Sequence, residues 1–202
     1  SSIVDTGTSV TITPDATINT VTVGLGGGAI STNTALGKLS LSANTTGYDN
    51  LGSGYNALAA NTIGYRNTAI GSGALAGVTS GNSNTAVGWQ ALNSNSTGVQ
   101  NIAIGGNAMV IATGNYNCVV GYGSLVQNTT GYYNVVLGNA VLGFNTTGAA
   151  NTAVGRGALN INVGGSGNVA LGTVALLTNS AGNYNTAVGY QSLRNTTGTS
   201  NI

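Results

Sequence analysis

The residue whose type and setting most favour catalysis is Asp5, in the stretch IVDTGTSV from Ile3 to Val10. A carboxylate in such a turn can do acid–base chemistry when a second carboxylate shares its proton, as in aspartic proteases. The only other carboxylates, Asp15 and Asp49, carry no second Asp-Thr-Gly. About 30 unrepeated residues surround the motif, far fewer than the ~100 of a compact domain. We therefore interpret Asp5–Gly7 as a polar turn.

Other catalytic arrangements lack their residues. The sequence contains neither histidine nor glutamate, which excludes Ser-His-Asp triads and histidine metal sites. The stretch GLGGGA at Gly24–Ala29 lacks the Lys-Ser/Thr ending of a phosphate loop. Cys118, the one cysteine, can form no internal disulfide, and we expect it to be a small buried apolar residue. We predict a protein that is no enzyme and holds no cofactor or metal.

The charge composition excludes further partners. The 202 residues contain four Lys and Arg and three Asp and Glu, for a net charge of +1. No basic field exists that would hold phosphates, so we expect no nucleic-acid binding. No apolar run reaches the ~18 residues of a spanning helix, so we expect no membrane insertion.

An internal repeat dominates the chain from Asn33 onward. The clearest copies are NTALG at Asn33, NTAIG at Asn67, NTAVG at Asn84, Asn151 and Asn185, and NIAIG at Asn101. Units begin at residues 33, 50, 67, 84, 101, 117, 134, 151, 168 and 185, and another begins at 201. Most units have 17 residues, and the two that begin at 101 and 185 have 16. Below, positions are counted from the Asn of each unit.

The pattern of the columns predicts an all-β fold. A 17-residue unit with two glycines is too short for two helices but fits two strands of four or five residues with two turns. Positions 2 and 4 are β-branched or aliphatic in most units, and position 9 is Leu or Met109. We predict that these three columns form the core of a parallel β-solenoid (β-roll) of about ten coils. The predicted division is an N-terminal β segment and connector, 1–32, and the solenoid, 33–202.

Three further columns have expected structural roles. The glycines at position 5 and three residues before each new Asn supply turns that need positive φ or close backbone approach. The Asn at position 1, and a partial Asn column in the following loop, predict side-chain ladders between coils. Both short units lose a residue between position 9 and the second glycine, so this segment is a loop that tolerates length change.

Position 3 is Ala, Val or Gly throughout, although strand alternation places it opposite positions 2 and 4. If positions 2 and 4 are the core, position 3 is a small apolar stripe on the outside. We therefore predict that position 3 packs against other chains. The predicted interface residues are Ala69, Ala86, Ala103, Ala153, Ala170 and Ala187.

Aromatic residues gather at two corners of the expected coil. Position 6 holds Trp89 and three tyrosines, and the loop before the next Asn holds six more tyrosines. Exposed rings on an uncharged surface suit stacking against sugars, which makes Tyr116, Tyr132, Tyr133 and Trp89 candidate glycan-binding residues. The alternative interpretation is that these rings cover neighbouring coils or chains.

The units NTAVGWQALNSNSTG from Asn84 and NTAVGYQSLRNTTG from Asn185 resemble the repeats of phage tail fibres and bacterial surface fibres. They are also distantly similar to the SVAIG-type repeats in the head domains of trimeric autotransporter adhesins. The resemblance covers residues 33–202 and implies a left-handed β-roll with three chains side by side.

This resemblance implies a structural and adhesive role. The expected protein is a homotrimeric segment of a phage tail fibre, located on the virion, that presents or forms a surface for a host cell-surface receptor, with a glycan as a candidate. A bacterial surface adhesin, extracellular or on the cell surface, is the alternative. An ice- or surface-binding solenoid is a further alternative, against which the sequence offers two arguments. Its best threonine column, position 2, is assigned to the core, and the column is broken by Leu51, Ile102, Cys118, Val135 and Val169.

Overall fold

The computed structural model describes residues 15–18 and 21–202. The stretch Ile3–Val10, with the Asp-Thr-Gly turn, lies outside the described residues. The described part is built from strands and turns, with one short 3₁₀ turn, η1 (Gly27–Ala29). The prediction of an all-β chain is confirmed.

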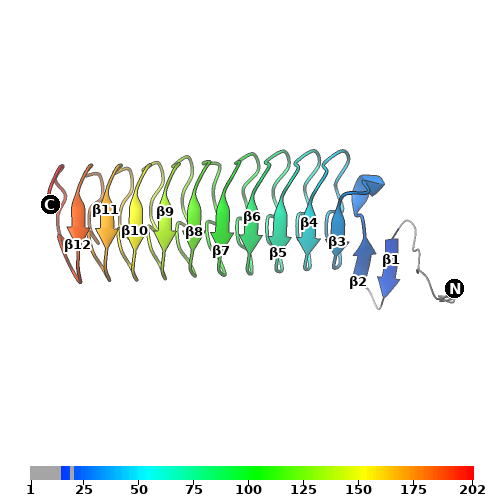
Figure 1. The fold of residues 1–202 in the computed structure, drawn as a ribbon, viewed down its shortest axis with the longest axis horizontal. Helices are drawn as coiled ribbons and strands as arrows, with labels where there is room; N and C mark the ends of the chain where they lie inside the picture. Colours follow the sequence, from blue (N-terminus) through cyan, green and yellow to red (C-terminus); the bar gives the residue numbers. More distant parts are fainter. Residues whose placement is uncertain (1–14, 19–20) are drawn as a thin grey trace.

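One twelve-stranded sheet runs through the described residues in sequence order. Strands β1 (Asp15–Ile18) and β2 (Val21–Gly24) form an antiparallel hairpin, and β2 pairs antiparallel with β3 (Thr34–Leu36). From β3 to β12 every neighbouring pair is parallel, and the coils stack side by side into a rod (Figure 1). The remaining strands are β4 (Leu51–Ser53), β5 (Thr68–Ile70), β6 (Thr85–Val87), β7 (Ile102–Ile104), β8 (Cys118–Val120), β9 (Val135–Leu137), β10 (Thr152–Val154), β11 (Val169–Leu171) and β12 (Thr186–Val188). The predicted β-solenoid is thus confirmed.

Each coil pairs with its neighbours in register with the sequence repeat. Position 2 pairs with position 2 along the rod, as Thr85 does with Ile102 and Ile102 with Cys118. This register continues across the short unit that begins at Asn101. The missing residue is therefore absorbed in the loop, as the sequence predicts.

The expectation of two strands per coil is wrong, because each coil contains one three-residue strand at positions 2–4. The other side of the coil is made of turns in which left-handed residues recur, such as Gln90 (φ 55°), Leu92 (φ 50°) and Gln100 (φ 55°). Backbone hydrogen bonds still join the coils there, for example from Leu92 N to Ala108 O at 3.0 Å. Inter-coil pairing thus continues where the strand geometry stops.

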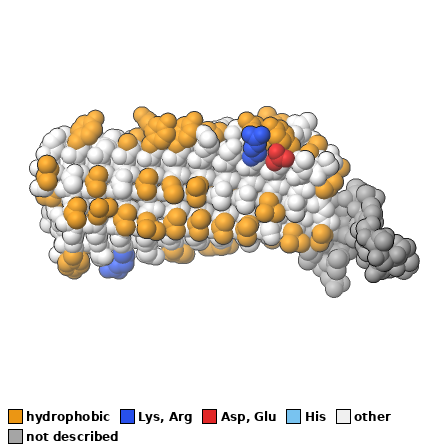
Figure 2. Space-filling view, in the orientation of Figure 1, with side chains coloured by type: hydrophobic (Ala, Val, Ile, Leu, Met, Phe, Trp, Pro, Cys, Tyr) orange, Lys and Arg blue, Asp and Glu red, His pale blue; other side chains and the backbone are white. Residues whose placement is uncertain are grey.

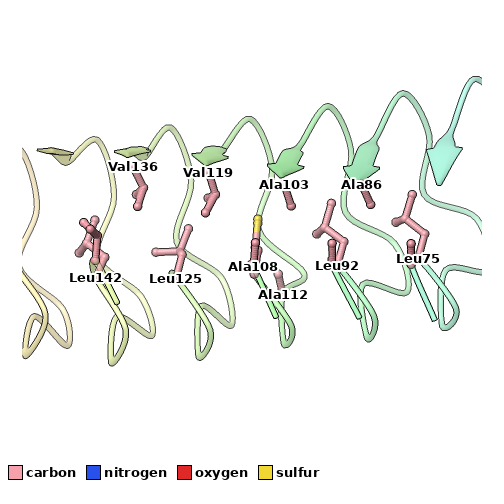
Figure 3. Packing of buried hydrophobic residues seen from close by; sticks show 14 of the residues in the cluster. Leu75, Ala86, Leu92, Ala103, Ala108, Ala112, Val119, Leu125, Val136 and Leu142 are labelled. Carbon is pink, nitrogen blue, oxygen red and sulfur yellow. The ribbon is translucent and has the colours of Figure 1, made fainter. Parts of the chain in front are cut away.

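The predicted phase of the strand is also wrong. In every strand from β3 to β12 the central residue, at position 3, is buried, while positions 2 and 4 are half-buried or exposed. Position 9 is buried as predicted, with Leu92 at 0 % exposure. Figure 3 shows Ala86 and Leu92 entering the interior from opposite sides of the rod.

The narrowness of the coil explains this inversion. A single 16- or 17-residue turn encloses too little space for bulky side chains from both sides. The large leucine comes from the turn side, and the strand side therefore contributes a small residue, so that the interior is filled without overpacking. Small size at position 3 is thus a property of the core, not of an interface between rods.

The predicted interface residues must be corrected accordingly. All six lie within the chain's own hydrophobic core at 0–1 % exposure and are not available to another chain. They are Ala69, Ala86, Ala103, Ala153, Ala170 and Ala187.

The glycine at position 5 has the two predicted properties. Gly88 has φ 131°, and a Cβ atom placed on it would lie 2.6 Å from the carbonyl carbon of Gly105 in the next coil. Side chains rarely adopt such a φ, and the backbones are too close to admit one. The turn after each strand therefore depends on glycine.

The Asn ladder at position 1 is present, and it lies inside the rod. Asn101 Oδ1 accepts hydrogen bonds from Asn117 N (3.0 Å) and Asn117 Nδ2 (3.2 Å), and Asn101 Nδ2 donates to Gly114 O at 2.9 Å. Each amide thus satisfies buried backbone groups of its own coil and the next. A partial second ladder is formed at position 12, for example from Asn145 Nδ2 to Asn128 Oδ1 at 2.8 Å.

Candidate functional site

Charged groups are sparse on the described surface. Arg66 Nε lies 3.9 Å from Asp49 Oδ2, and both side chains are largely exposed. Within residues 15–18 and 21–202, no three His, Cys, Asp or Glu side chains gather where they could bind a metal. The same residues contain no helix with the length and apolar character needed to span a membrane. The remaining candidate sites are apolar and aromatic surfaces.

The outward face of the sheet from β3 to β12 carries an extended apolar surface, which we call the strand face. It consists of the side chains at positions 2 and 4, and Figure 2 shows hydrophobic side chains in rows along the rod. Its most exposed members at position 4 are Leu36 (43 %), Ile70 (42 %), Leu137 (49 %) and Val188 (67 %). The side chains that the sequence assigned to the core thus form the surface.

The strand face is continuous and uncharged. Position 4 is aliphatic in every coil except that of Ser53, and position 2 is a mixture of threonine and aliphatic residues. Because the strands pair in register, like positions follow one another at one coil spacing, about 4.8 Å. Cys118 lies in this face at position 2 of β8 and is half-buried, so the expectation that it is a buried core residue is wrong.

Aromatic residues border the strand face at both ends of the strands. Position 6 follows each strand and holds the exposed Trp89 and Tyr122, whereas positions 16 and 17 precede the next strand. The latter hold Tyr48 and Tyr65, whose rings stack 4.9 Å apart and 3° from parallel. They also hold Tyr116, Tyr132 and Tyr133, which form the densest group.

The three tyrosines Tyr116, Tyr132 and Tyr133 are in direct contact, as their proximity on neighbouring coils predicts. The rings of Tyr116 and Tyr133 stack with centroids 5.0 Å apart, and Tyr132 meets Tyr133 edge-on at 5.3 Å. Beside them is a hollow of about 370 Å³, which we call the tyrosine hollow. It is lined by Thr113, Gly114, Asn115, Tyr116, Thr130, Tyr132 and Tyr133. Trp89 is not among its lining residues.

The hollow coincides with the irregularity in the repeat. In the unit that begins at Asn101, the loop before Gly114 is one residue shorter than in the neighbouring coils, and Ala112 occupies the inner position 12. The next coil retains the full loop and presents Thr130 at position 14. A gap in the row of position-14 side chains therefore lies next to the tyrosine group. The sequence signal for it is the missing residue, which predicts a length-tolerant loop but not a cavity.

The chain matches no protein-family model, and no curated protein or solved structure is significantly similar to it. The strand face and the tyrosine hollow are therefore the two features from which a function is inferred.

Proposed function

We propose that the chain is a segment of a homotrimeric surface fibre in which the strand faces of three rods pack against one another. The observation that carries the proposal is the uncharged aliphatic strand face from β3 to β12. Soluble monomers rarely expose a continuous apolar patch of this extent. Closed rotational symmetry covers the same patch once in each chain.

The proposed interface consists of positions 4 and 2. Ile70, Ile104 and Leu137, each 39–49 % exposed, form its centre. These residues have no charged neighbour within the strands, so burying them leaves no unpaired charge behind. The choice of three chains over two comes from the resemblance of the repeats to fibre proteins.

The role that fits this assembly is structural and adhesive. Stacked coils joined by backbone hydrogen bonds and Asn ladders make a stiff rod, in which each coil contacts only its neighbours. We propose a phage tail fibre on the virion that presents or forms a surface for a host cell-surface receptor. A bacterial surface adhesin of the same architecture is the alternative.

One observation favours a second candidate, an ice- or surface-binding solenoid. Of the two sequence arguments against it, the assignment of position 2 to the core is wrong, because position 2 lies on the outward face of the sheet. An outward, flat row of threonines is what such a surface needs. The row is interrupted, however, because five coils carry another residue: Leu51, Ile102, Cys118, Val135 and Val169. Thermal hysteresis of the purified chain would support this candidate, and its absence would exclude it.

The assembly is tested by sedimentation equilibrium and light scattering. We expect a mass three times that of the 19.7 kDa chain. The double variant Val87→Asp/Ile104→Asp places charges in the strand face and should dissociate the trimer. Its matched control, Ser94→Asp/Thr97→Asp, adds the same charges to exposed turns of one coil and should remain trimeric. A wild-type monomer at micromolar concentration would overturn the proposal.

Cys118 offers an independent probe, because the only thiol of the chain lies in the proposed interface. A maleimide should react with it more slowly in the wild-type assembly than in the Val87→Asp/Ile104→Asp variant, since packing blocks access to the sulfur. If the variant has a smaller assembly mass than the wild type but its thiol reacts at the same rate, another surface forms the assembly.

A further inference from the structure

We propose that the tyrosine hollow binds one ring of an uncharged saccharide. This names a ligand class for the adhesive role proposed above and rests on that role for its biological meaning, but the site lies within one chain. The argument depends on the shape of the hollow, its aromatic walls, its free polar groups and its lack of charge.

The three tyrosine rings present aromatic faces in two different orientations, on which a sugar ring can pack. Tyr116 and Tyr133 are stacked, with an angle of 24° between their planes, whereas Tyr132 stands at 73° to Tyr133. All three side chains are exposed, at 44–55 %. A sugar ring has one face of C–H groups that packs on such a surface while its hydroxyls remain at the edge, where they can find partners.

Polar groups at the rim are positioned to meet those hydroxyls. Asn115 Oδ1 accepts a hydrogen bond from Val99 N at 2.8 Å, which fixes the orientation of the amide. Among the described residues, neither Asn115 Nδ2 nor Thr130 Oγ1 has a hydrogen-bond partner, so both remain available to a ligand. A few fixed polar groups within a mostly apolar cavity are the usual composition of a small-molecule site.

The lining contains no charged residue, which selects the class of saccharide. A phosphate, a sulfate or the carboxylate of an acidic sugar would enter the hollow without a cation to pair with, at a cost in desolvation. The volume of about 370 Å³ lies in the range of small-ligand pockets, about 300–1,000 Å³. The hollow therefore suits a neutral ring.

The stacked pair Tyr48 and Tyr65 provides an internal comparison. These rings occupy position 16 of the first two coils, the same position as Tyr132. Their neighbouring coils all have the full 17 residues, whereas the coil of Tyr132 follows the 16-residue unit, and they do not line the hollow. If stacked tyrosines alone bound sugars, both groups would do so. The proposal predicts binding at the hollow only.

The experiment uses the whole chain on an array of neutral and acidic glycans, followed by saturation-transfer NMR with maltotriose, cellotriose and N-acetylchitotriose as probes. We expect neutral glycans to bind and the affinity to fall about tenfold or more in Tyr132→Ala. The matched control Tyr65→Ala should bind as the wild type does. Tyr132→Phe, which keeps the ring, should retain most of the affinity.

A second variant tests the hollow without removing an aromatic ring. Inserting one threonine after Thr113 restores the 17-residue loop and should fill the gap, so binding should be lost while the fold and the mass of the assembly are kept. The proposal is overturned if no neutral glycan binds or if binding survives both the insertion and Tyr132→Ala. It is equally overturned if Tyr132→Ala dissociates the assembly, which would show that a neighbouring chain covers the hollow. A trimer that binds no sugar would leave the fibre proposal intact, and a monomer that binds sugar would leave this one intact.

Discussion

Asn95 follows Val78 in the inner column at position 12, and its Nδ2 atom is buried with no hydrogen-bond partner among the described residues. On the other side of Val78, Asn61 Oδ1 is also buried and has no hydrogen-bond partner among the described residues. In unbroken parts of the column, the amide of one coil donates to the amide of the preceding coil, as Asn61 does to Asn44 at 2.8 Å. Val78 thus interrupts the ladder and leaves Asn61 Oδ1 without a donor, and the Asn95 amide is turned so that its Oδ1 accepts from Gly98 N at 2.6 Å while its Nδ2 is unpaired.

Replacing Val78 with Asn should therefore stabilise the rod. The new amide gives partners to Asn61 Oδ1 and Asn95 Nδ2, and each unsatisfied buried group costs about 1–3 kcal/mol. The lost valine contributes about 1.5–3 kcal/mol of apolar burial, so we expect a net gain of about 1 kcal/mol, seen as a higher melting temperature at equal protein concentration. Val78→Ala is the control and should lower it. Equal losses in both variants would contradict the ladder explanation.

Leu92→Ala should destabilise the chain by about 2–5 kcal/mol. Leu92 is fully buried opposite Ala86, and its removal leaves a cavity that the neighbouring coils cannot fill. Chemical denaturation measures the change in free energy of unfolding. Ser94→Ala, an exposed substitution on the same coil, should change it by less than about 0.5 kcal/mol. Wild-type stability of Leu92→Ala would mean that position 9 is not a core position.

Gly88→Ala and Gly123→Ala should differ sharply, although both glycines have positive φ. A Cβ on Gly88 would meet the backbone of Gly105 at 2.6 Å, whereas one on Gly123 (φ 60°) would have nothing within 4 Å. Gly123→Ala should cost only about 1–2 kcal/mol of left-handed strain, since Gln90 and Asn56 adopt the same conformation at this position in other coils. We expect Gly88→Ala to disrupt coil stacking, with a drop in melting temperature at least twice as large. Similar drops would show that φ alone, and not backbone approach, requires Gly88.

Asn134→Ala should destabilise the rod by about 1–3 kcal/mol, the cost of one buried unpaired group. The Asn134 amide accepts from Asn151 N at 3.0 Å and donates to Gly148 O at 3.0 Å. Its removal leaves Asn151 N buried and unpaired, whereas Gly148 O keeps its hydrogen bond from Asn145 Nδ2 at 3.0 Å. Asn82→Ala makes the same chemical change at a half-buried site outside the ladders and should have little effect. The measurement is the free energy of unfolding, and equal values for the two variants would show that the position-1 ladder contributes nothing.

The repeat length, the register, the two glycine columns and the position-1 Asn ladder could all be predicted from the sequence. Each follows from the residues that recur at the same position in every coil. A position that is always Gly indicates a positive φ or a close backbone contact, and a position that is always Asn indicates that the side-chain amide is needed. The grouping of Tyr116 with Tyr132 and Tyr133 follows from the same register. In a solenoid, residues one repeat apart must be neighbours, so the sequence period determines these contacts.

Only the tertiary structure decided which face of the strand is inside. Alternation separates Ala86 from Thr85 and Val87 but does not say which side faces the core. Hydrophobicity alone favours the larger side chains of positions 2 and 4, and that choice is wrong because the interior is already occupied by Leu92 from the opposite side of the coil. The space across a single narrow turn admits one large side chain and one small one. Alanine therefore lies inside, and the aliphatic residues beside it form the surface.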